Sequence, residues 1–304
     1  MKYDLIIVRY GEIGLKAKET RRRFESSLVN NIKNALKTKS LSSRIRTERG
    51  RIYVYTDQID KAISVLQKIF GITSISPAVQ IKSNMDLMSK LSIKISKENL
   101  TEVKNFALRV TRTGEHSFTS QDVAIKLGSD IVKATKSSVN LTKPDFELFI
   151  EIRNENAYFF IEKIRGTGGL PLGTQGKVLA IIDKPPSILA AWYLMKRGCK
   201  TIFVNTDEAN IDTLKAFTSS WFAKSDIKQL NLKSNNFYDD TSKLAIEKNC
   251  DAIITGHTLN DNPLENLSEI KLLKQHIKLP ILFPLIAMKK DEINKKCKEL
   301  GIQK

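Results

Sequence analysis

The sequence predicts a mixed α/β protein, with α+β modules in its N-terminal half and a parallel sheet in its C-terminal half. Its 304 residues are enough for two or three domains, each with a hydrophobic core. A segment rich in Gly and Pro, RGTGGLPLGTQG at 165–176, separates two parts of the chain. The hydrophobic periodicity changes at Lys177, because short apolar runs begin there to alternate with helical patterns.

The first module, residues 1–81, has the predicted element order β-α-β-β-α-β. Apolar residues spaced by four, such as Phe24 and Leu28, indicate a helix that follows Thr20 as its N-cap, and Arg49–Gly50 supplies a tight turn. Strands are expected at 3–8, 44–49, 51–55 and 72–81, and helices at 20–36 and 59–70. This order is that of a ferredoxin-like domain.

The second module spans residues 82–166. Helical patterns are expected near 85–91 and 119–138, and strands at 102–111, 146–153 and 157–164. The alternation in FELFIEI, from Phe146, is typical of a half-buried strand. The glycines of 165–176 favour a linker over a phosphate-binding loop, because the segment follows a hairpin and opens no helix.

The third module, residues 177–304, alternates strands with helices. Strands are expected at 178–182, 201–204, 227–232, 252–255 and 281–283, and helices at 187–197, 211–224, 239–248, 263–276 and 289–300. This alternation predicts a parallel sheet covered on both faces. Ligands of such folds bind at the carboxyl ends of strands, so the turns after Ile182 and Thr255 are candidate sites.

The net charge of +17 is concentrated in the N-terminal part of the chain. Residues 1–176 hold 30 basic and 18 acidic side chains, whereas residues 177–304 hold 20 and 15. The arginines are clustered, at 21–23 and again at 44–51, and guanidinium forks match phosphate oxygens as ammonium groups cannot. These features favour a nucleic-acid partner over a merely solvated lysine-rich surface.

The sequence contains no pattern typical of a membrane-spanning segment or of a metal site. No apolar run approaches the roughly 20 residues of a membrane helix, and the N-terminal apolar core is too short for a signal peptide. We therefore expect a cytoplasmic protein with no membrane partner. Cys199, Cys250 and Cys297 lack metal-ligand or disulfide spacing, so they are expected to be buried thiols.

Several motifs resemble those of tRNA 4-thiouridine synthetases, a family that includes the sulfur-transfer proteins of thiamine biosynthesis. They are YGEIGLK (10–16), NLTKPDFELFIEIR (140–153), EKIRGTGGLPLGTQGKVL (162–179) and AAWYLMKRG (190–198). The resemblance implies a ferredoxin-like domain, a THUMP RNA-binding domain and a PP-loop (adenine nucleotide hydrolase-like) domain. It also implies an enzyme that adenylates O4 of a uridine in tRNA and replaces it with sulfur.

The turn at 182–187 departs from the family's PP-loop, Ser-Gly-Gly-x-Asp-Ser, of which only Ser187 is matched. A phosphate cradle needs glycine conformations and convergent N–H donors. Pro185 and Pro186 have no N–H to give, and Lys184 carries a full side chain where the backbone must come close. Asp183 adds a negative charge. We therefore expect a degenerate loop that is an ordinary helix start, and no cofactor.

Two further departures concern the rest of the third module. The segment TGHTLNDNPLEN (255–266) resembles the Thr-Gly-His-x-x-Asp-Asp motif of other tRNA-thiolating PP-loop enzymes. It matches at Thr255, Gly256, His257 and Asp261, and Asn260 replaces the first acid of the motif. His257 is interpreted either as a remnant of a site or as a solvated histidine at a strand end. The family's sulfur-handling cysteine lies beyond the helix resembling 291–302, so no counterpart is expected up to Lys304.

The resemblance implies that tRNA is the partner and that basic residues of the first two modules contact its phosphates. The candidates are Lys16, Arg21, Arg22, Arg23, Arg49, Arg51, Arg109, Arg112, Lys126 and Arg165. Such contacts provide affinity and position, so RNA would be selected by its shape and its single-stranded end. Each arginine taken singly can equally be a solvated charge or a salt-bridge partner.

Three hypotheses follow. The first is a tRNA-binding protein that has lost adenylation chemistry and acts as an adaptor or non-adenylating homologue in tRNA thiolation. The second is an active sulfurtransferase that uses ATP and Mg²⁺ through an unusual loop or a partner chain. The third is a small-molecule or nucleotide sensor built on the degenerate domain. A sulfur carrier, a thiolating enzyme or a second copy of the chain remain open as further partners.

Overall fold

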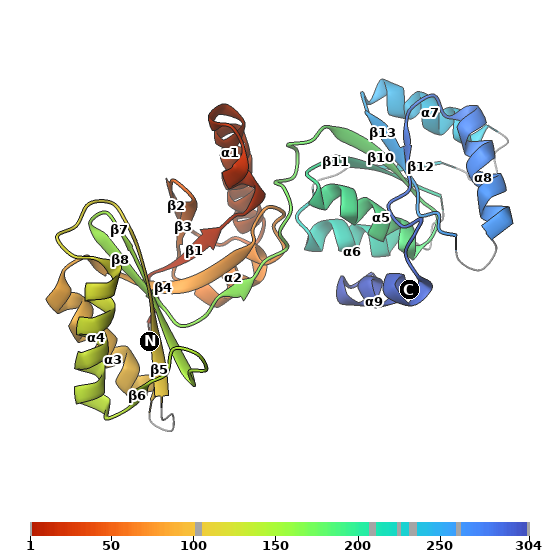
Figure 1. Ribbon diagram of the computed structural model, residues 1–304. Coiled ribbons are helices and arrows are strands. Elements are labelled where there is room, and N and C mark those ends of the chain that lie inside the picture. The colour runs from red at the N-terminus through yellow and green to blue at the C-terminus, as the bar shows by residue number, and fades with distance from the viewer. Residues whose placement is uncertain are drawn as a thin grey trace. The chain divides into compact units, whose positions relative to one another are not determined.

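The computed structural model describes residues 2–100, 105–206, 211–223, 226–230, 236–259 and 263–302 (Figure 1). The chain forms two compact units. Unit 1 consists of 1–9, 36–67 and 74–165, and unit 2 consists of 10–35, 68–73 and 166–304. The chain therefore passes between the units several times, and neither unit is one continuous segment.

Unit 1 is built on one sheet, in which nine strands are found among the described residues. Their order is β2-β3-β1-β4-β8-β7-β5-β6, with β9 paired to β4. The strands are β1 (Leu5–Arg9), β2 (Arg44–Glu48), β3 (Arg51–Tyr55), β4 (Ser74–Lys82), β5 (Asn105–Thr113), β6 (Ser138–Val139), β7 (Phe146–Arg153), β8 (Asn156–Phe160) and β9 (Ile164–Arg165). The arrangement β2-β3-β1-β4 is antiparallel, as the predicted ferredoxin-like order requires.

Strand β4 belongs to both halves of this sheet. Its residues 74–78 pair with β1, and its residues 79–82 pair with β8. Beyond β8, the hairpin partner β7 pairs with β5 in parallel. The expected boundary between the first two modules, at residue 81, thus falls within a single strand.

Helices cover one face of the second half of the sheet. They are α3 (Met85–Asn99) and α4 (Ser120–Thr135), and α2 (Ile59–Leu66) contacts β1 and β4. Asn84 caps α3 with its side chain, and Thr119 caps α4 in a capping box with Asp122. Met88 and Val123 pack there against Ile150 and other apolar residues of β7 and β8. Helix α3 is longer than the predicted 85–91.

The other face of the sheet is apolar at its centre, and residues from distant strands meet there. Leu5, Ile7, Tyr53 and Tyr158 form one buried cluster there, and the rings of Tyr53 and Tyr158 stack with centroids 4.8 Å apart. Their strands, β3 and β8, are separated by β1 and β4 in the strand order. A flat sheet would hold them about 14 Å apart. The sheet therefore bends at β4 until its two halves face each other.

Unit 2 contains the predicted parallel sheet, in the order β12-β11-β10-β13-β14. The strands are β10 (Lys177–Ile182), β11 (Lys200–Asn205), β12 (Ile227–Gln229), β13 (Ala252–Ile254) and β14 (Ile281–Leu282). The helices are α5 (Pro185–Lys196), α6 (Ile211–Ser220), α7 (Phe237–Glu247), α8 (Pro263–His276) and α9 (Lys290–Glu299). Earlier in the chain lie the 3₁₀-helix η1 (Glu12–Leu15) and the helix α1 (Lys18–Thr38).

Both faces of this parallel sheet are buried, which explains the continuous apolar runs in the sequence. Val178 and Ala180 of β10 face a core formed with α5, α6 and α9, whereas Leu179 and Ile181 face a core formed with α7 and α8. Successive residues of a strand point to opposite faces, so a strand covered on both sides must be apolar throughout.

The segment at 166–176 forms neither helix nor strand, as the linker prediction requires, although Arg165 still pairs with Ser74 of β4. Gly169 adopts a φ of +76°, and a Cβ placed on it would lie 2.1 Å from the carbonyl oxygen of Lys196. Leu170 donates its N–H to that same carbonyl at 2.9 Å. This glycine therefore allows the segment to pack against the C-terminal end of α5.

Candidate nucleic-acid interface

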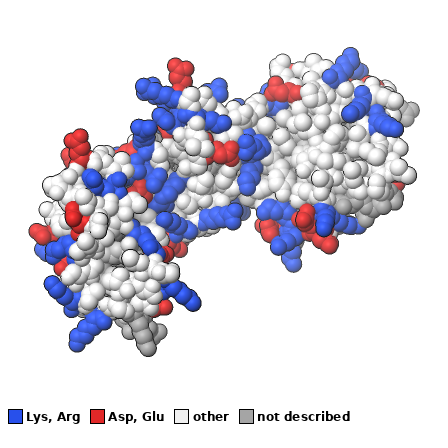
Figure 2. All heavy atoms as spheres, in the orientation of Figure 1, with Lys and Arg blue, Asp and Glu red and all other residues white. Residues whose placement is uncertain are grey.

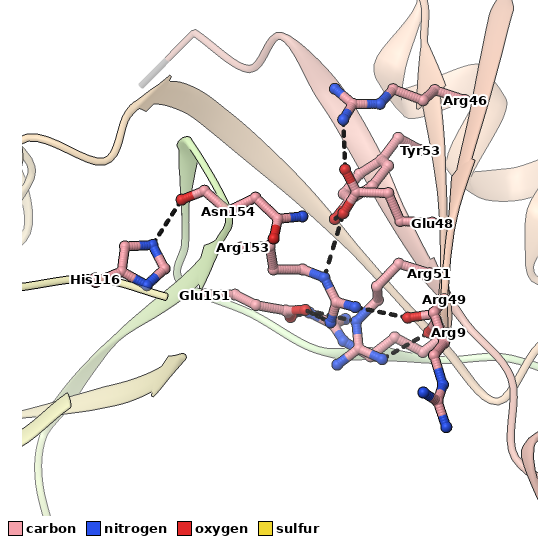
Figure 3. Close-up of polar contacts among 11 residues, drawn as sticks. Arg9, Arg46, Glu48, Arg49, Arg51, Tyr53, His116, Glu151, Arg153 and Asn154 are labelled. Carbon is pink, nitrogen blue, oxygen red and sulfur yellow. Dashed lines mark hydrogen bonds and ion pairs between the residues drawn. The ribbon is translucent and has the colours of Figure 1, made fainter. Parts of the chain in front are cut away.

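A buried carboxylate on β7 collects three guanidinium groups from three strands (Figure 3). Glu151 is 5% exposed. Arg51 of β3 donates from Nε to Oε1 at 2.7 Å, Arg9 of β1 donates from Nη2 to Oε2 at 3.3 Å, and Arg153 donates from Nη1 to Oε1 at 3.2 Å. The contacts join strands from the two facing halves of the sheet.

Arg153 extends this network to β2 and to the turn between β2 and β3. Its Nη2 donates to the carbonyl oxygen of Arg49 at 2.6 Å, and its Nε lies 3.4 Å from Oε2 of Glu48. Glu48 also pairs with Arg46 and accepts a hydrogen bond from the hydroxyl of Tyr53 at 3.2 Å. The network therefore connects four strands and leaves Arg49 at its outer edge with an exposed side chain.

The electrostatics of the network favour ionised partners. Burial alone would raise the pKa of the Glu151 carboxyl, but the guanidinium groups of Arg51 and Arg9 outweigh it and hold that pKa below its ordinary value. Burial lowers the pKa of Arg9, and Glu151 opposes this effect. Removal of one partner leaves a buried charge without its counter-charge. We therefore expect loss of one partner to lower the free energy of unfolding by about 3–5 kcal/mol.

Four of the basic residues predicted from the sequence have intramolecular partners. Arg51 is bound to Glu151, as described above. Arg109 donates from Nε to Glu147 at 2.7 Å, and Lys126 lies 2.8 Å from Asp130. Arg112 donates from Nη1 to the carbonyl oxygen of Gly114 at 2.9 Å, and the same nitrogen lies 3.2 Å from Nδ1 of His116. His116 in turn contacts the carbonyl oxygen of Asn154 (Figure 3).

Most of the other predicted basic residues have exposed side chains. Lys16, Arg22, Arg23, Arg49 and Arg165 have exposed side chains. Arg21 is partly exposed, with Nε 4.0 Å from Glu25. Figure 2 shows Lys and Arg side chains over much of the visible face of the N-terminal part. Arg49, Arg51, Arg109, Arg112, Lys126 and Arg165 belong to unit 1, and the residues at 16 and 21–23 belong to unit 2.

The sequence reasoning missed Arg9, Glu151 and Arg153. All three lie in strands, and Glu151 and Arg153 belong to the alternating run FELFIEIR. Alternation of this kind usually places charges in water. For Glu151 and Arg153, the signal that could have identified them is the presence of opposite charges, two residues apart, on one face of that strand.

At the start of α5, the turn after β10 leads directly into the helix, as predicted. Lys184 is the N-cap residue with an extended φ of −156°, and Pro185 and Pro186 occupy the first two helical positions. Ser187 donates its N–H to the carbonyl oxygen of Lys184 at 3.0 Å, and its hydroxyl donates to the carboxylate of Asp183. Ser187 is 1% exposed.

The loop after β13 closes onto this turn. A Cβ placed on Gly256 would lie 2.4 Å from Oγ of Ser187, so only glycine allows the approach. Thr255 is buried, and its hydroxyl lies 2.8 Å from Nδ1 of His257. Nε2 of His257 lies 3.1 Å from Glu269. Asn260 and Asp261, which the motif comparison also singled out, lie outside the described residues.

Two carboxylates, Asp183 and Glu269, lie near this edge of the parallel sheet, and Lys184 lies 3.8 Å from Asp183. Burial raises the pKa of the Tyr238 hydroxyl, and the charges of Glu269 and Asp183 add to the effect. Anionic side chains near a helix start compete with bound phosphate for the same N–H groups and the same positive potential.

The cysteines and the search for metal or membrane sites add no further chemistry. Cys199, Cys250 and Cys297 are buried and free, and burial raises the pKa of each thiol. Within the described ranges, no group of three or more His, Cys, Asp and Glu residues is placed to hold a metal ion. No helix in the described part of the chain is long and apolar enough to cross a membrane.

Comparison with known domains places the chain in the class of proteins that join a ferredoxin-like domain and a THUMP domain to a ThiI-type α/β domain. The ThiI ferredoxin-like domain matches residues 5–76, the THUMP domain matches 82–162, and the thiamine biosynthesis protein (ThiI) family matches 221–304. The chain belongs to the tRNA sulfurtransferase family. This confirms the family predicted from the sequence motifs.

Individual relatives support this assignment along nearly the whole chain. A probable tRNA sulfurtransferase of Methanobrevibacter smithii is 33% identical over 338 residues, covering 99% of this chain and 87% of that protein. The corresponding protein of Thermococcus kodakarensis is 31% identical, with 98% and 88% covered. These alignments reach further than the family match at 221–304, and so include the turn at 182–187.

Two solved structures share the fold. The crystal structure of PH1313 from Pyrococcus horikoshii superimposes with a TM-score of 0.84 at 33% identity, covering 98% of this chain and 99% of that one. A 4-thiouridine synthetase, solved as an RNA complex with bound ATP, superimposes with a TM-score of 0.82 at 27% identity, covering 99% and 85%.

Proposed function

We propose that this chain binds tRNA and takes part in tRNA thiolation without adenylating the tRNA itself. The start of α5 carries the second half of this proposal, because the turn at 183–187 offers no cradle for the phosphates of a nucleotide. The chain is then an adaptor or a non-adenylating homologue within its family. Its partners would be a thiolating enzyme or a sulfur carrier, and a homodimer is compatible with this role.

The charge distribution supports tRNA binding. Residues 1–176 carry most of the excess positive charge, and exposed arginines such as Arg22, Arg49 and Arg165 can reach phosphates without breaking an internal contact. The THUMP match at 82–162 and the similarity to a synthetase solved with RNA support the same partner. Contacts of this kind make binding dependent on salt, because each neutralised phosphate releases counterions.

The backbone N–H groups available at the turn support the loss of ATP binding. A phosphate at a helix start is bound by free N–H groups. Pro185 and Pro186 lack them, and the N–H of Ser187 is donated to Lys184. The hydroxyl of Ser187 is likewise used by Asp183. We infer that a triphosphate does not fit this turn, and no catalytic step is assigned to it.

An active enzyme is the second candidate, and one observation favours it. The 4-thiouridine synthetase similar to this chain along 99% of its length holds bound ATP. If this chain used ATP and Mg²⁺, the nucleotide would have to bind by contacts other than those of the turn at 183–187, or with the help of another chain.

Two measurements on the whole chain separate the candidates. Titration with tRNA at increasing salt is expected to show binding that weakens as salt rises. Thermal unfolding with and without ATP and Mg²⁺ is expected to show no shift, because a ligand that binds only the native state must stabilise it. An upward shift in melting temperature with ATP would favour the active enzyme, and absence of tRNA binding at low salt would refute both candidates.

A loop-restoration variant serves as the positive control for ATP binding. It combines Ile182→Ser, Asp183→Gly, Lys184→Gly and Pro186→Asp, which together return the family's loop. A gain of ATP-dependent stabilisation in this variant would show that the assay detects nucleotide binding and that the original turn is what prevents it.

A further inference from the structure

Three residues lie side by side across β5, β7 and β8 on the sheet face that the helices leave uncovered. Phe149 of β7 is the register partner of Arg109 of β5 and of Phe160 of β8. Residues directly opposite each other on paired strands point to the same face. The neighbours of Phe149 along the strand, Leu148 and Ile150, pack on the other face in the core with α3 and α4. Phe149 therefore points away from those helices.

The ring of Phe149 is packed on one side only. It lies parallel to the ring of Phe160, at an interplanar angle of 3° with centroids 5.2 Å apart, which leaves no room for a third group between them. Phe160 is buried, whereas Phe149 is half-buried. The outer face of Phe149 is covered by the ammonium group of Lys163, whose Nζ lies 4.3 Å from the ring centroid.

The side chain of Lys163 can rotate away from the ring of Phe149. Its side chain is exposed, and no strand or helix includes it. Burial lowers the pKa of its ammonium group, the nearby charge of Arg9 adds to this effect, and the charges of Glu147 and Glu151 oppose it. The lysine is thus partly dehydrated at the ring, and this cost is relieved when the ammonium group moves to an anion.

We propose that Phe149 is a stacking platform for one unpaired base of RNA, and that Lys163 and Arg109 contact the phosphates on either side of that base. The proposal rests on the tRNA binding proposed above and adds the site at which single-stranded RNA is recognised. Aromatic rings on a sheet face, flanked by cations, provide the interaction that unpaired bases make in proteins, because every base has a π face and every nucleotide a phosphate.

The surrounding charges favour a nucleotide over an acidic or purely apolar partner surface. The nearest carboxylates, Glu147 and Glu151, also act on Lys163, but they are paired with four guanidinium groups, so positive charge remains in excess around the ring. Of the two stacked rings, that of Phe149 is partly exposed and that of Phe160 is buried. One ring is the size of a base and too small for a protein interface.

The test compares Phe149→Leu with Tyr55→Leu. Leucine keeps apolar volume at either position and removes the ring. Tyr55 is a matched control, because it borders the same apolar cluster and also has a cation over its ring, with Cζ of Arg44 4.6 Å from the centroid. Binding is measured with a short single-stranded RNA that contains 2-aminopurine, with an RNA duplex of equal charge, and with tRNA.

Phe149→Leu is expected to bind the single strand roughly 5- to 100-fold more weakly, the range that stacking of one base provides. Its duplex affinity and the steepness of its salt dependence stay unchanged. The wild type is expected to change 2-aminopurine fluorescence, Phe149→Leu is not, and Phe149→Trp restores the change. Tyr55→Leu behaves as the wild type. Equal loss for single strand and duplex, or unchanged single-strand binding, would overturn the proposal.

A second variant does not touch the apolar cluster. Lys163→Ala should reduce the slope of log affinity against log salt by about one phosphate contact and leave the fluorescence change intact. An unchanged slope contradicts the role of Lys163. If the wild type binds no RNA at all, the proposed function itself fails. If the wild type binds and Phe149→Leu binds equally well, only the stacking site fails.

Discussion

Glu151 on β7 and Arg51 on β3 are joined by an ion pair of 2.7 Å, although β1, β4 and β8 lie between their strands in the sheet. The contact exists because β4 pairs with β1 along one part of its length and with β8 along the other. It fixes the ferredoxin-like half of the sheet against the THUMP half. Basic residues on these two halves, such as Arg49 and Arg109, thereby belong to one compact unit, unit 1.

Replacement of Glu151 by Gln should destabilise the protein by about 3–5 kcal/mol, because three half-buried guanidinium groups would lose the buried anion that they share. Glu147→Gln on the same strand is the matched control. Glu147 also pairs with an arginine, but the side chain is 36% exposed, so its loss should cost about 1 kcal/mol or less. Urea unfolding of the three proteins measures the difference. Equal destabilisation by the two variants would contradict the role given to Glu151.

The same carboxylate predicts how stability depends on pH. Because the pKa of Glu151 is lower in the folded protein than its ordinary value of 4.5, its contribution is complete above that value and is lost as the pH falls through the lowered pKa. The melting temperature of the wild type should therefore fall more steeply below about pH 4.5 than that of Glu151→Gln. Parallel curves for the two proteins between pH 6 and pH 3 would argue that Glu151 does not supply this stability.

The arginines at 21–23 are expected to contact phosphates. Changing all three to Ala should weaken binding to most tRNAs alike, and should reduce the slope of log affinity against log salt by up to about three. The control changes Lys271, Lys274 and Lys278, exposed residues at or just beyond the end of α8, to Ala. A filter-binding series at several salt concentrations is sufficient. Equal effects of the two triple variants would show that only net charge matters.

Gly256 tests whether the loop after β13 closes onto the start of α5. Gly256→Ala would place a methyl group 2.4 Å from Oγ and 2.8 Å from Cα of Ser187, so we expect a loss of about 1–3 kcal/mol in the free energy of unfolding. Gly14→Ala is a control, because no atom lies within 4 Å of the added Cβ. If Gly256→Ala is as stable as the control, this space is open and could accept a ligand.

The order of elements could be predicted from the sequence because local patterns determine it. The strand at 146–153 and the helix at 263–276 were located to the residue, and the apolar runs of the parallel sheet follow from burial on both faces. Helix α3 was predicted too short because Ser92 and Ser96 interrupt its apolar pattern. Ser92 is buried nonetheless, and its hydroxyl is satisfied by the carbonyl oxygen of Met88.

The network around Glu151 could not be predicted from local patterns. The alternation in FELFIEIR correctly indicates that residues 147, 149, 151 and 153 share a face, but it does not reveal that a second half of the sheet covers part of that face. That covering depends on the two partners of β4, which are far apart in the sequence. For the same reason Arg51, expected as a phosphate ligand, was not recognised as a partner of Glu151.

The central claim is that the chain binds tRNA but does not activate it with ATP. ATP–pyrophosphate exchange, measured with the intact chain, Mg²⁺ and a tRNA concentration that saturates binding, tests it most directly. The account predicts exchange no greater than that of a sample without protein, because Pro185 and Pro186 have no N–H groups to offer a phosphate and the N–H of Ser187 is donated to Lys184. Exchange that depends on both the protein and tRNA would contradict it and favour the active enzyme.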